Sequence, residues 1–257
     1  MQRLIAGSLL GICLLVAAAT EAIGGSGTTG TTVQQSDVRF TTAAPGKSAG
    51  FGMAIASTDQ TNPRNRQPKR TTSFGISFPA GTSIDSRVAP QCRASESDFA
   101  AADDPDDACP RGSKLGIGRA AVRLPFPGMA DVPGTVSAYN AVKGLLVFVD
   151  FPTMNKTLLL RPKFAGLRLT TVVPRICLPP GTPQNDCAGG FGGPQEAILV
   201  QLTLRTRPKS ARSARGPRRL VRTPRTCPSG GWALRTNFRY SDGSSLVIPA
   251  RSRCRRP

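Results

Sequence analysis

The densest group of potentially functional side chains is a basic stretch between residues 205 and 225. It contains nine cationic residues and no acid. Guanidinium and ammonium groups bind phosphate and carboxylate groups through charge-assisted hydrogen bonds, so the stretch predicts an anion-binding function. The nine residues are Arg205, Arg207, Lys209, Arg212, Arg215, Arg218, Arg219, Arg222 and Arg225.

Residue types that support catalysis are scarce. The chain has no histidine, which excludes Ser-His-Asp and Cys-His catalysis, His-ligated metal sites and His-based pH switches. Asp150 could act as an acid or base, but it has no identifiable carboxylate partner, and the chain contains neither a GxSxG nor an SxxK motif. The sequence therefore predicts a non-catalytic protein and leaves a carboxylate- or Ser/Lys-dependent enzyme as the alternative.

Two patterns resemble cofactor or metal sites, but neither has the required context. The four aspartates of residues 103–107 lack the glycine and the distal glutamate of an EF-hand, so a solvated acidic loop is expected. A formal GxGxxA motif at residues 116–121 lies among strand-like segments and not between a strand and a helix. We predict no cofactor and no metal.

Residues 1–22 have the composition of a secretory signal peptide. Arg3 supplies the positive charge, residues 4–19 are apolar, and small residues follow at the expected cleavage point. We expect cleavage, with an uncleaved anchor helix as the alternative, and no later run is long and apolar enough to span a bilayer. Cleavage removes one basic and one acidic residue, so the net charge remains +19.

The cysteines predict an oxidised protein. Seven are present, and removal of Cys13 with the signal peptide leaves an even number in an exported chain, which is typical of disulfides. We predict sequential pairs, each closing a short or medium loop that stabilises the fold by roughly 2–4 kcal/mol. The pairs are Cys92–Cys109, Cys177–Cys187 and Cys227–Cys254, and other connectivities stay open.

The predicted fold is organised around residues 134–151. Two apolar runs flank Ala141-Val142-Lys143-Gly144, where Gly144 can adopt the positive φ of a tight turn, so the stretch predicts a β-hairpin. Residues 145–149 are apolar at every position, which is typical of a central strand covered on both faces. Alternation with a period of two recurs at residues 51–56, 74–78, 198–204 and 232–240.

These patterns predict an all-β fold, an antiparallel two-sheet β-sandwich of Ig-like or jelly-roll-like type, with a β-barrel as the alternative. One short helix is expected near residues 95–102, where a serine precedes an acid by three residues. Residues 23–48 are expected to form a flexible spacer with a possible weak strand, and residues 49–257 a single domain. The stretch at 205–225 is too polar to bury apolar surface, so a mobile, protruding loop is expected there.

The chain resembles a group of exported, disulfide-containing, β-rich proteins of high-GC actinobacteria to which no activity is assigned. The resemblance covers roughly residues 70–254 and depends on the segments FPAGTSIDSRVAPQCRASE, ACPRGSKLGIGRA, GTVSAYN and LVRTPRTCPSGGWALRTNFRYSDG. It implies export, a bacterial envelope setting and a β-rich fold, and it transfers no site residue.

Together, these features favour a secreted, envelope-associated binding or structural protein that contacts anionic cell-wall polymers or lipid head groups. A net charge of +19 would attract such surfaces in a salt-dependent manner. High-GC genomes also favour arginine, so solvated side chains without a ligand are an equal alternative. Nucleic-acid binding is less favoured, because the basic stretch contains no aromatic residue that could stack on bases.

Overall fold

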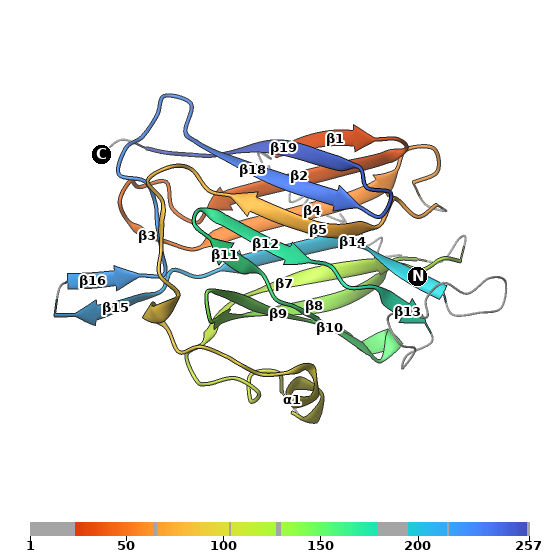
Figure 1. The fold of residues 1–257 in the computed structure, drawn as a ribbon, viewed down its shortest axis with the longest axis horizontal. Coiled ribbons are helices and arrows are strands. Elements are labelled where there is room, and N and C mark those ends of the chain that lie inside the picture. Colours follow the sequence, from red (N-terminus) through yellow and green to blue (C-terminus); the bar gives the residue numbers. More distant parts are fainter. Residues whose placement is uncertain are drawn as a thin grey trace, which may run out of the picture.

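A computed structural model describes residues 24–63, 66–102, 104–126, 130–178, 195–214 and 216–255. Strands dominate it (Figure 1). The first strands in the chain are β1 (Gly25–Thr29), β2 (Thr32–Phe40), β3 (Ser48–Ala49), β4 (Phe51–Asp59), β5 (Thr71–Ser77) and β6 (Ser83–Ile84). The central part contains α1 (Glu96–Ala101), β7 (Lys114–Arg123), β8 (Val132–Ala141), β9 (Gly144–Phe151), β10 (Lys156–Leu160), β11 (Lys163–Ala165), β12 (Arg168–Val172) and β13 (Ile176–Leu178). The last strands are β14 (Gln195–Thr206), β15 (Ser210–Ser213), β16 (Gly216–Arg219), β17 (Val221–Arg222), β18 (Trp232–Tyr240) and β19 (Ser245–Ser252), and two short 3₁₀ turns are η1 (Ser86–Val88) and η2 (Pro152–Met154).

The main sheet is one nearly closed barrel, so the prediction of a two-sheet sandwich is wrong. Its strands follow the order β1-β2-β4-β14-β7-β8-β9-β11-β12-β5-β18-β19, and Figure 1 shows β1 and β19, the two ends of this order, lying side by side. The strands next to these ends, β2 and β18, also touch through side chains, because Ser36 Oγ lies 2.7 Å from Thr236 Oγ1. Alternation with a period of two occurs in sandwiches and barrels alike. Long-range pairing decides between them, and here β14 joins β4 to β7 while β5 joins β12 to β18.

Strand β9 is covered on both faces, as its continuous apolar run predicts. Leu145, Val147 and Val149 belong to the barrel interior, whereas Leu146 and Phe148 belong to a second cluster on the outside.

The turn before β9 differs from the prediction. Lys143, and not Gly144, adopts the positive φ of 53°. The glycine is required for another reason, because a Cβ atom at Gly144 would lie 2.1 Å from the carbonyl oxygen of Pro162.

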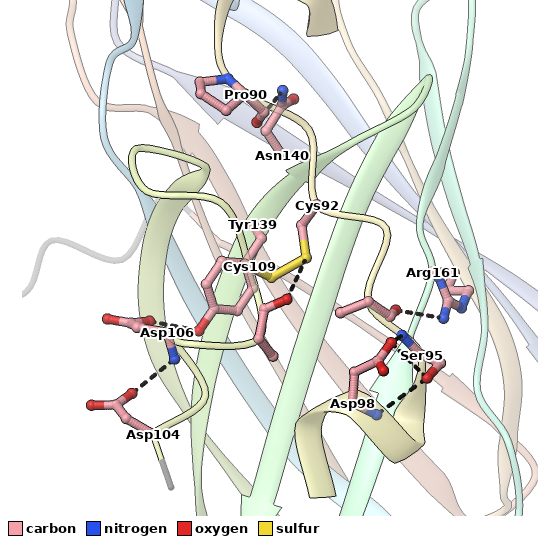
Figure 2. Close-up of a disulfide and its surroundings, with 12 residues drawn as sticks. Pro90, Cys92, Ser95, Asp98, Asp104, Asp106, Cys109, Tyr139, Asn140 and Arg161 are labelled. Atoms are coloured by element: carbon pink, nitrogen blue, oxygen red, sulfur yellow. Dashed lines mark hydrogen bonds between the residues drawn. A yellow bond between two sulfur atoms is a disulfide. The ribbon is translucent and has the colours of Figure 1, made fainter. Parts of the chain in front are cut away.

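The outer face of β8 and β9 is covered by a lobe formed by residues 92–109 (Figure 2). The Cys92–Cys109 disulfide closes this lobe, and Ser95 caps helix α1 with a capping box to Asp98. The Tyr139 hydroxyl donates to the Asp106 carboxylate at 2.6 Å, and Lys114 Nζ donates to the same carboxylate at 2.7 Å. The lobe is therefore a structural cover.

The Cys227–Cys254 disulfide links the open end of the β18–β19 hairpin, whose Asp-Gly turn has Gly243 at a φ of 83°. Two of the three predicted sequential pairs are thus present. Cys177 is buried and disulfide-bonded. Cys187 lies outside the described residues, so the pairing of these two cysteines stays a prediction. The disulfides indicate an oxidising environment, typical of extracytoplasmic proteins.

Two segments are more regular than their composition suggests. Residues 25–40, within the expected spacer, form β1 and β2, and β2 pairs with both β1 and β4. Its buried positions include Thr32, Gln34 and Ser36, so a pattern of apolar residues alone does not reveal it.

The segment 205–225, where a mobile loop is expected, contains regular structure. It holds the β15–β16 hairpin, which protrudes at one end of the barrel in Figure 1, and β17, which pairs with β3 and β6.

The barrel interior is filled by side chains. An interior void lined by Met53, Ile76, Val147 and neighbouring side chains measures about 20 Å³, which is space for about one water molecule. Binding of a larger ligand there would require the core to open.

Asp59 carries a pH-dependent part of the stability. Its carboxylate accepts hydrogen bonds from the Thr61 and Thr31 hydroxyls and from the backbone N–H groups of Thr61 and Asn62. These bonds, led by that of the Thr61 side chain, lower the pKa of Asp59 to about 2. The stabilisation is complete above the unfolded-state pKa of about 3.9 and is lost as the pH falls through the folded-state pKa.

We therefore expect Asp59→Asn to lower the melting temperature at pH 7 and the deficit to shrink between pH 4 and pH 2. Thermal unfolding of both proteins at pH 7, 4 and 2 measures this, with Asp107→Asn at an exposed carboxylate as the control. A deficit of equal size at pH 2 and pH 7 would contradict the assignment.

Candidate functional site

The best candidate site lies on the outer face of the barrel, over β2, β4, β14 and β7. The outward positions of β4 include Gly52, Ala54 and Ala56, which alternate with buried Phe51, Met53 and Ile55. Because the neighbouring strands carry larger outward side chains, β4 forms the floor of a trough. In β4 the large side chains point into the core and the small ones point outward, and the small ones leave a hollow on the outer face.

Three arginines from three different strands line one part of this trough, with Arg39 and Arg205 at its end and Arg119 two residues further along, in the row of Thr203. Strand pairing places Arg39 of β2 and Arg205 of β14 on either side of Gly52. Arg205 pairs with Ile117 of β7, so Arg119 lies on the diagonal from Arg205, at about 7–8 Å between backbones. We call this hollow the basic groove; it measures about 570 Å³ and is lined by Asp37, Arg39, Phe40, Thr41, Gly52, Met53, Ala54, Ile117, Gly118, Arg119, Thr203, Leu204 and Arg205.

The basic groove has an excess of positive charge. All three arginines are exposed. Among the described residues, the only carboxylate that pairs with one of them is Asp37, at 3.6 Å from Arg39 Nε. Arg119 and Arg205 form no ion pair within the part of the chain that the structure describes. The arrangement suits a phosphate or carboxylate group, which can accept from several guanidinium groups at once.

A second hollow continues the trough away from the arginines. We call it the polar hollow; it measures about 430 Å³ and shares Asp37, Ala54 and Thr203 with the basic groove. Among the described residues that line it, Asp37 is the only charged one, and the others are small or uncharged. The two hollows therefore differ in charge but lie end to end on one face.

The structure distributes the nine basic residues of the 205–225 stretch among different environments. Arg205 lines the basic groove. Lys209 and Arg219 donate to the carbonyl oxygens of Gly112 and Gly46, at 3.3 and 2.9 Å. Arg207, Arg212 and Arg225 are exposed, Arg222 is half-buried in β17, and Arg215 lies outside the described residues.

Arg218 has a structural contact. Its Nε donates to Asp85 Oδ2 at 2.9 Å and so ties the hairpin to the segment between β6 and η1. Burial alone would raise the pKa of Asp85, but hydrogen bonds from Arg218 and Arg87 lower it. Arg218 is therefore engaged within the protein, whereas Arg207, Arg212 and Arg225 stay exposed.

Arg39 and Arg119 were not predicted as site residues. They are isolated basic residues, far from Arg205 in the sequence, and only the pairing of β2, β4, β14 and β7 brings the three together. In the sequence each is a single basic residue within a strand-like segment. Strand pairing places Arg39 beside Gly52. It places Arg119 between Thr203 and Thr135.

The other candidate residues do not form a site. Asp150 lies on β9 in register with Thr135 and Thr157, and not with a second carboxylate. Among the described residues, no group of three potential metal ligands converges. Gly116 and Gly118 of the GxGxxA pattern lie within β7 and face the β14 backbone.

Comparisons with family models, with curated proteins and with solved structures find no match to this chain. Within the part of the chain that the structure describes, no helix has the length and apolarity needed to cross a membrane.

Proposed function

We propose that this protein is an exported, non-catalytic binding protein of the cell envelope that attaches to an anionic polymer through the basic groove. The observation that carries the proposal is the convergence of Arg39, Arg119 and Arg205, from three strands, on one groove of about 570 Å³. The signal-like N-terminus and the disulfides support a setting outside the cytoplasm.

The overall charge supports the same function. A net charge of +19 attracts polyanions at long range, and the attraction weakens as salt screens it. The groove adds what a diffuse charge lacks, because strand register holds the backbones of the three arginines close to one another. Their side chains therefore reach one bound anion without a rearrangement of the sheet, which would lower the affinity.

The alternatives fit this site less well. A hydrolase acting on such a polymer would use paired carboxylates, whereas Asp37 is the only carboxylate among the described residues that line the basic groove. Single-stranded nucleic acid would need aromatic stacking. The one aromatic residue in the described lining of the groove, Phe40, packs its ring against Phe78 and Trp232 in the interior.

A pair of triple variants with equal charge tests the proposal. We expect Arg39→Ala/Arg119→Ala/Arg205→Ala to weaken binding to long-chain polyphosphate by at least about tenfold, since each exposed charge contact contributes about 0.5–1 kcal/mol. Arg207→Ala/Arg212→Ala/Arg225→Ala removes the same charge from exposed positions outside the groove, and we expect it to bind nearly as well as the parent. Binding to polyphosphate and to a Gram-positive cell-wall preparation would be measured at low and physiological salt.

Equal losses in the two variants would show that binding follows net charge and not the groove. A larger loss in the second variant would place binding on the 205–225 segment, as its composition suggests. Melting temperatures of both variants control for folding.

A further inference from the structure

We propose that the basic groove and the polar hollow together bind one glycan segment that carries an anionic substituent. The anion would lie at the three arginines and the uncharged sugar body along the polar hollow. This inference rests on the proposed function, because it names the class of anionic ligand that the same face takes.

The two hollows form one elongated binding surface. They share Asp37, Ala54 and Thr203, which lie in one row across β2, β4 and β14. From the Arg39–Arg205 row to the Gln35–Gln201 row the trough extends four residues along the strands, or about 13 Å at about 3.3 Å per residue. That length suits a short oligosaccharide better than a single phosphate ion.

The chemistry changes along the trough from cationic to neutral. The described residues that line the polar hollow include no basic one, and the long polar side chains among them are those of Gln35 and Gln201, which are both exposed. A carboxamide both donates and accepts hydrogen bonds, as a sugar hydroxyl does. The neutral end therefore complements hydroxyl groups and offers no cation to a further anionic group.

Asp37 lies at the junction of the two hollows and lacks part of its hydrogen bonding. Its Oδ2 is 3.6 Å from Arg39 Nε, whereas no donor among the described residues reaches its buried Oδ1. An ionised carboxylate only accepts hydrogen bonds, so it complements a hydroxyl group and repels a phosphate.

This charge pattern disfavours a polyanion of uniform charge. Inorganic polyphosphate or nucleic acid laid along the trough would place an anionic group beside Asp37 and others among neutral amides. A glycan with one anion and several free hydroxyls avoids both conflicts.

Isothermal titration of the mature chain at one fixed ionic strength tests the inference. The probes are maltotriose with a single terminal phosphate, 3′-sialyllactose with its single carboxylate, inorganic phosphate, tripolyphosphate and an oligothymidylate. We expect at least one charged trisaccharide to bind at least about tenfold more tightly than inorganic phosphate, and the two trisaccharides distinguish a phosphate from a carboxylate ligand. We expect Gln201→Leu to weaken that trisaccharide about fivefold, the effect of one lost hydrogen bond, and to leave tripolyphosphate binding unchanged.

The matched control is Gln60→Leu, because Gln60 is exposed beyond the end of β4 and lines neither hollow. The glycan inference is overturned if the trisaccharides bind no better than inorganic phosphate, or if Gln201→Leu does not change their binding. The proposed function would stand in either case. Tighter binding of tripolyphosphate or oligothymidylate than of either glycan would also overturn the glycan inference. The proposed function fails separately, if the triple arginine variant of the groove retains polyphosphate binding.

Discussion

Replacing Phe99 by alanine is expected to lower the free energy of unfolding by about 3–5 kcal/mol, the usual cost of removing a buried aromatic ring. Phe99 is buried and stacks on Phe148, with ring centroids 4.6 Å apart. Its ring also lies 5.7 Å from that of Tyr139. The substitution uncovers the outer apolar face of β9, and urea denaturation of the disulfide-intact protein measures the loss.

The control is Val172→Ala, because Val172 is 72% exposed on β12. We expect that change to stay within about 0.5 kcal/mol of the parent. A loss below about 1 kcal/mol for Phe99→Ala would show that the lobe is not a structural cover, since even a small buried aliphatic truncation costs that much.

The sequence predicts the local structure of this chain better than it predicts the closure of the sheet into a barrel. Residues 145–149 predict a strand covered on both faces because every position is apolar, and the barrel interior and the lobe supply the two covers. The serine–acid spacing at Ser95 and Asp98 predicts helix α1 because capping is a local interaction. The barrel itself depends on pairings such as β14 with β4, between residues about 150 positions apart, and no local pattern specifies these.

The candidate site was predicted only in part for the same reason. A dense run such as residues 205–225 is conspicuous in the sequence, yet the fold uses Lys209, Arg218 and Arg219 for contacts within the protein. Two of the three groove arginines are isolated in the sequence and become neighbours only through strand register. Density of charge along the chain is therefore a poor guide to density of charge on the surface.

Two glycines of the basic groove are expected to respond in opposite ways to valine. A Cβ atom at Gly118 would lie 1.9 Å from the carbonyl oxygen of Thr203, so β7 and β14 must separate. We expect Gly118→Val to lower the free energy of unfolding by about 3 kcal/mol or more, at the upper end of overpacking costs. A Cβ atom at Gly52 meets only Arg39 Cγ, at 3.9 Å, and its φ is not positive, so valine fits there without strain.

Gly52→Val therefore separates binding from stability. Valine suits a strand better than glycine does, so the stability should stay unchanged or rise by up to about 1 kcal/mol. Its methyl groups would project from the floor of the groove between Arg39 and Arg205 and keep an anion from contacting both, so we expect polyphosphate binding to weaken about tenfold, the equivalent of about 1.4 kcal/mol. Urea denaturation and titration of the same preparation measure both effects. A stable Gly52→Val protein that binds as tightly as the parent would exclude the floor of this groove as the place where the anion lies.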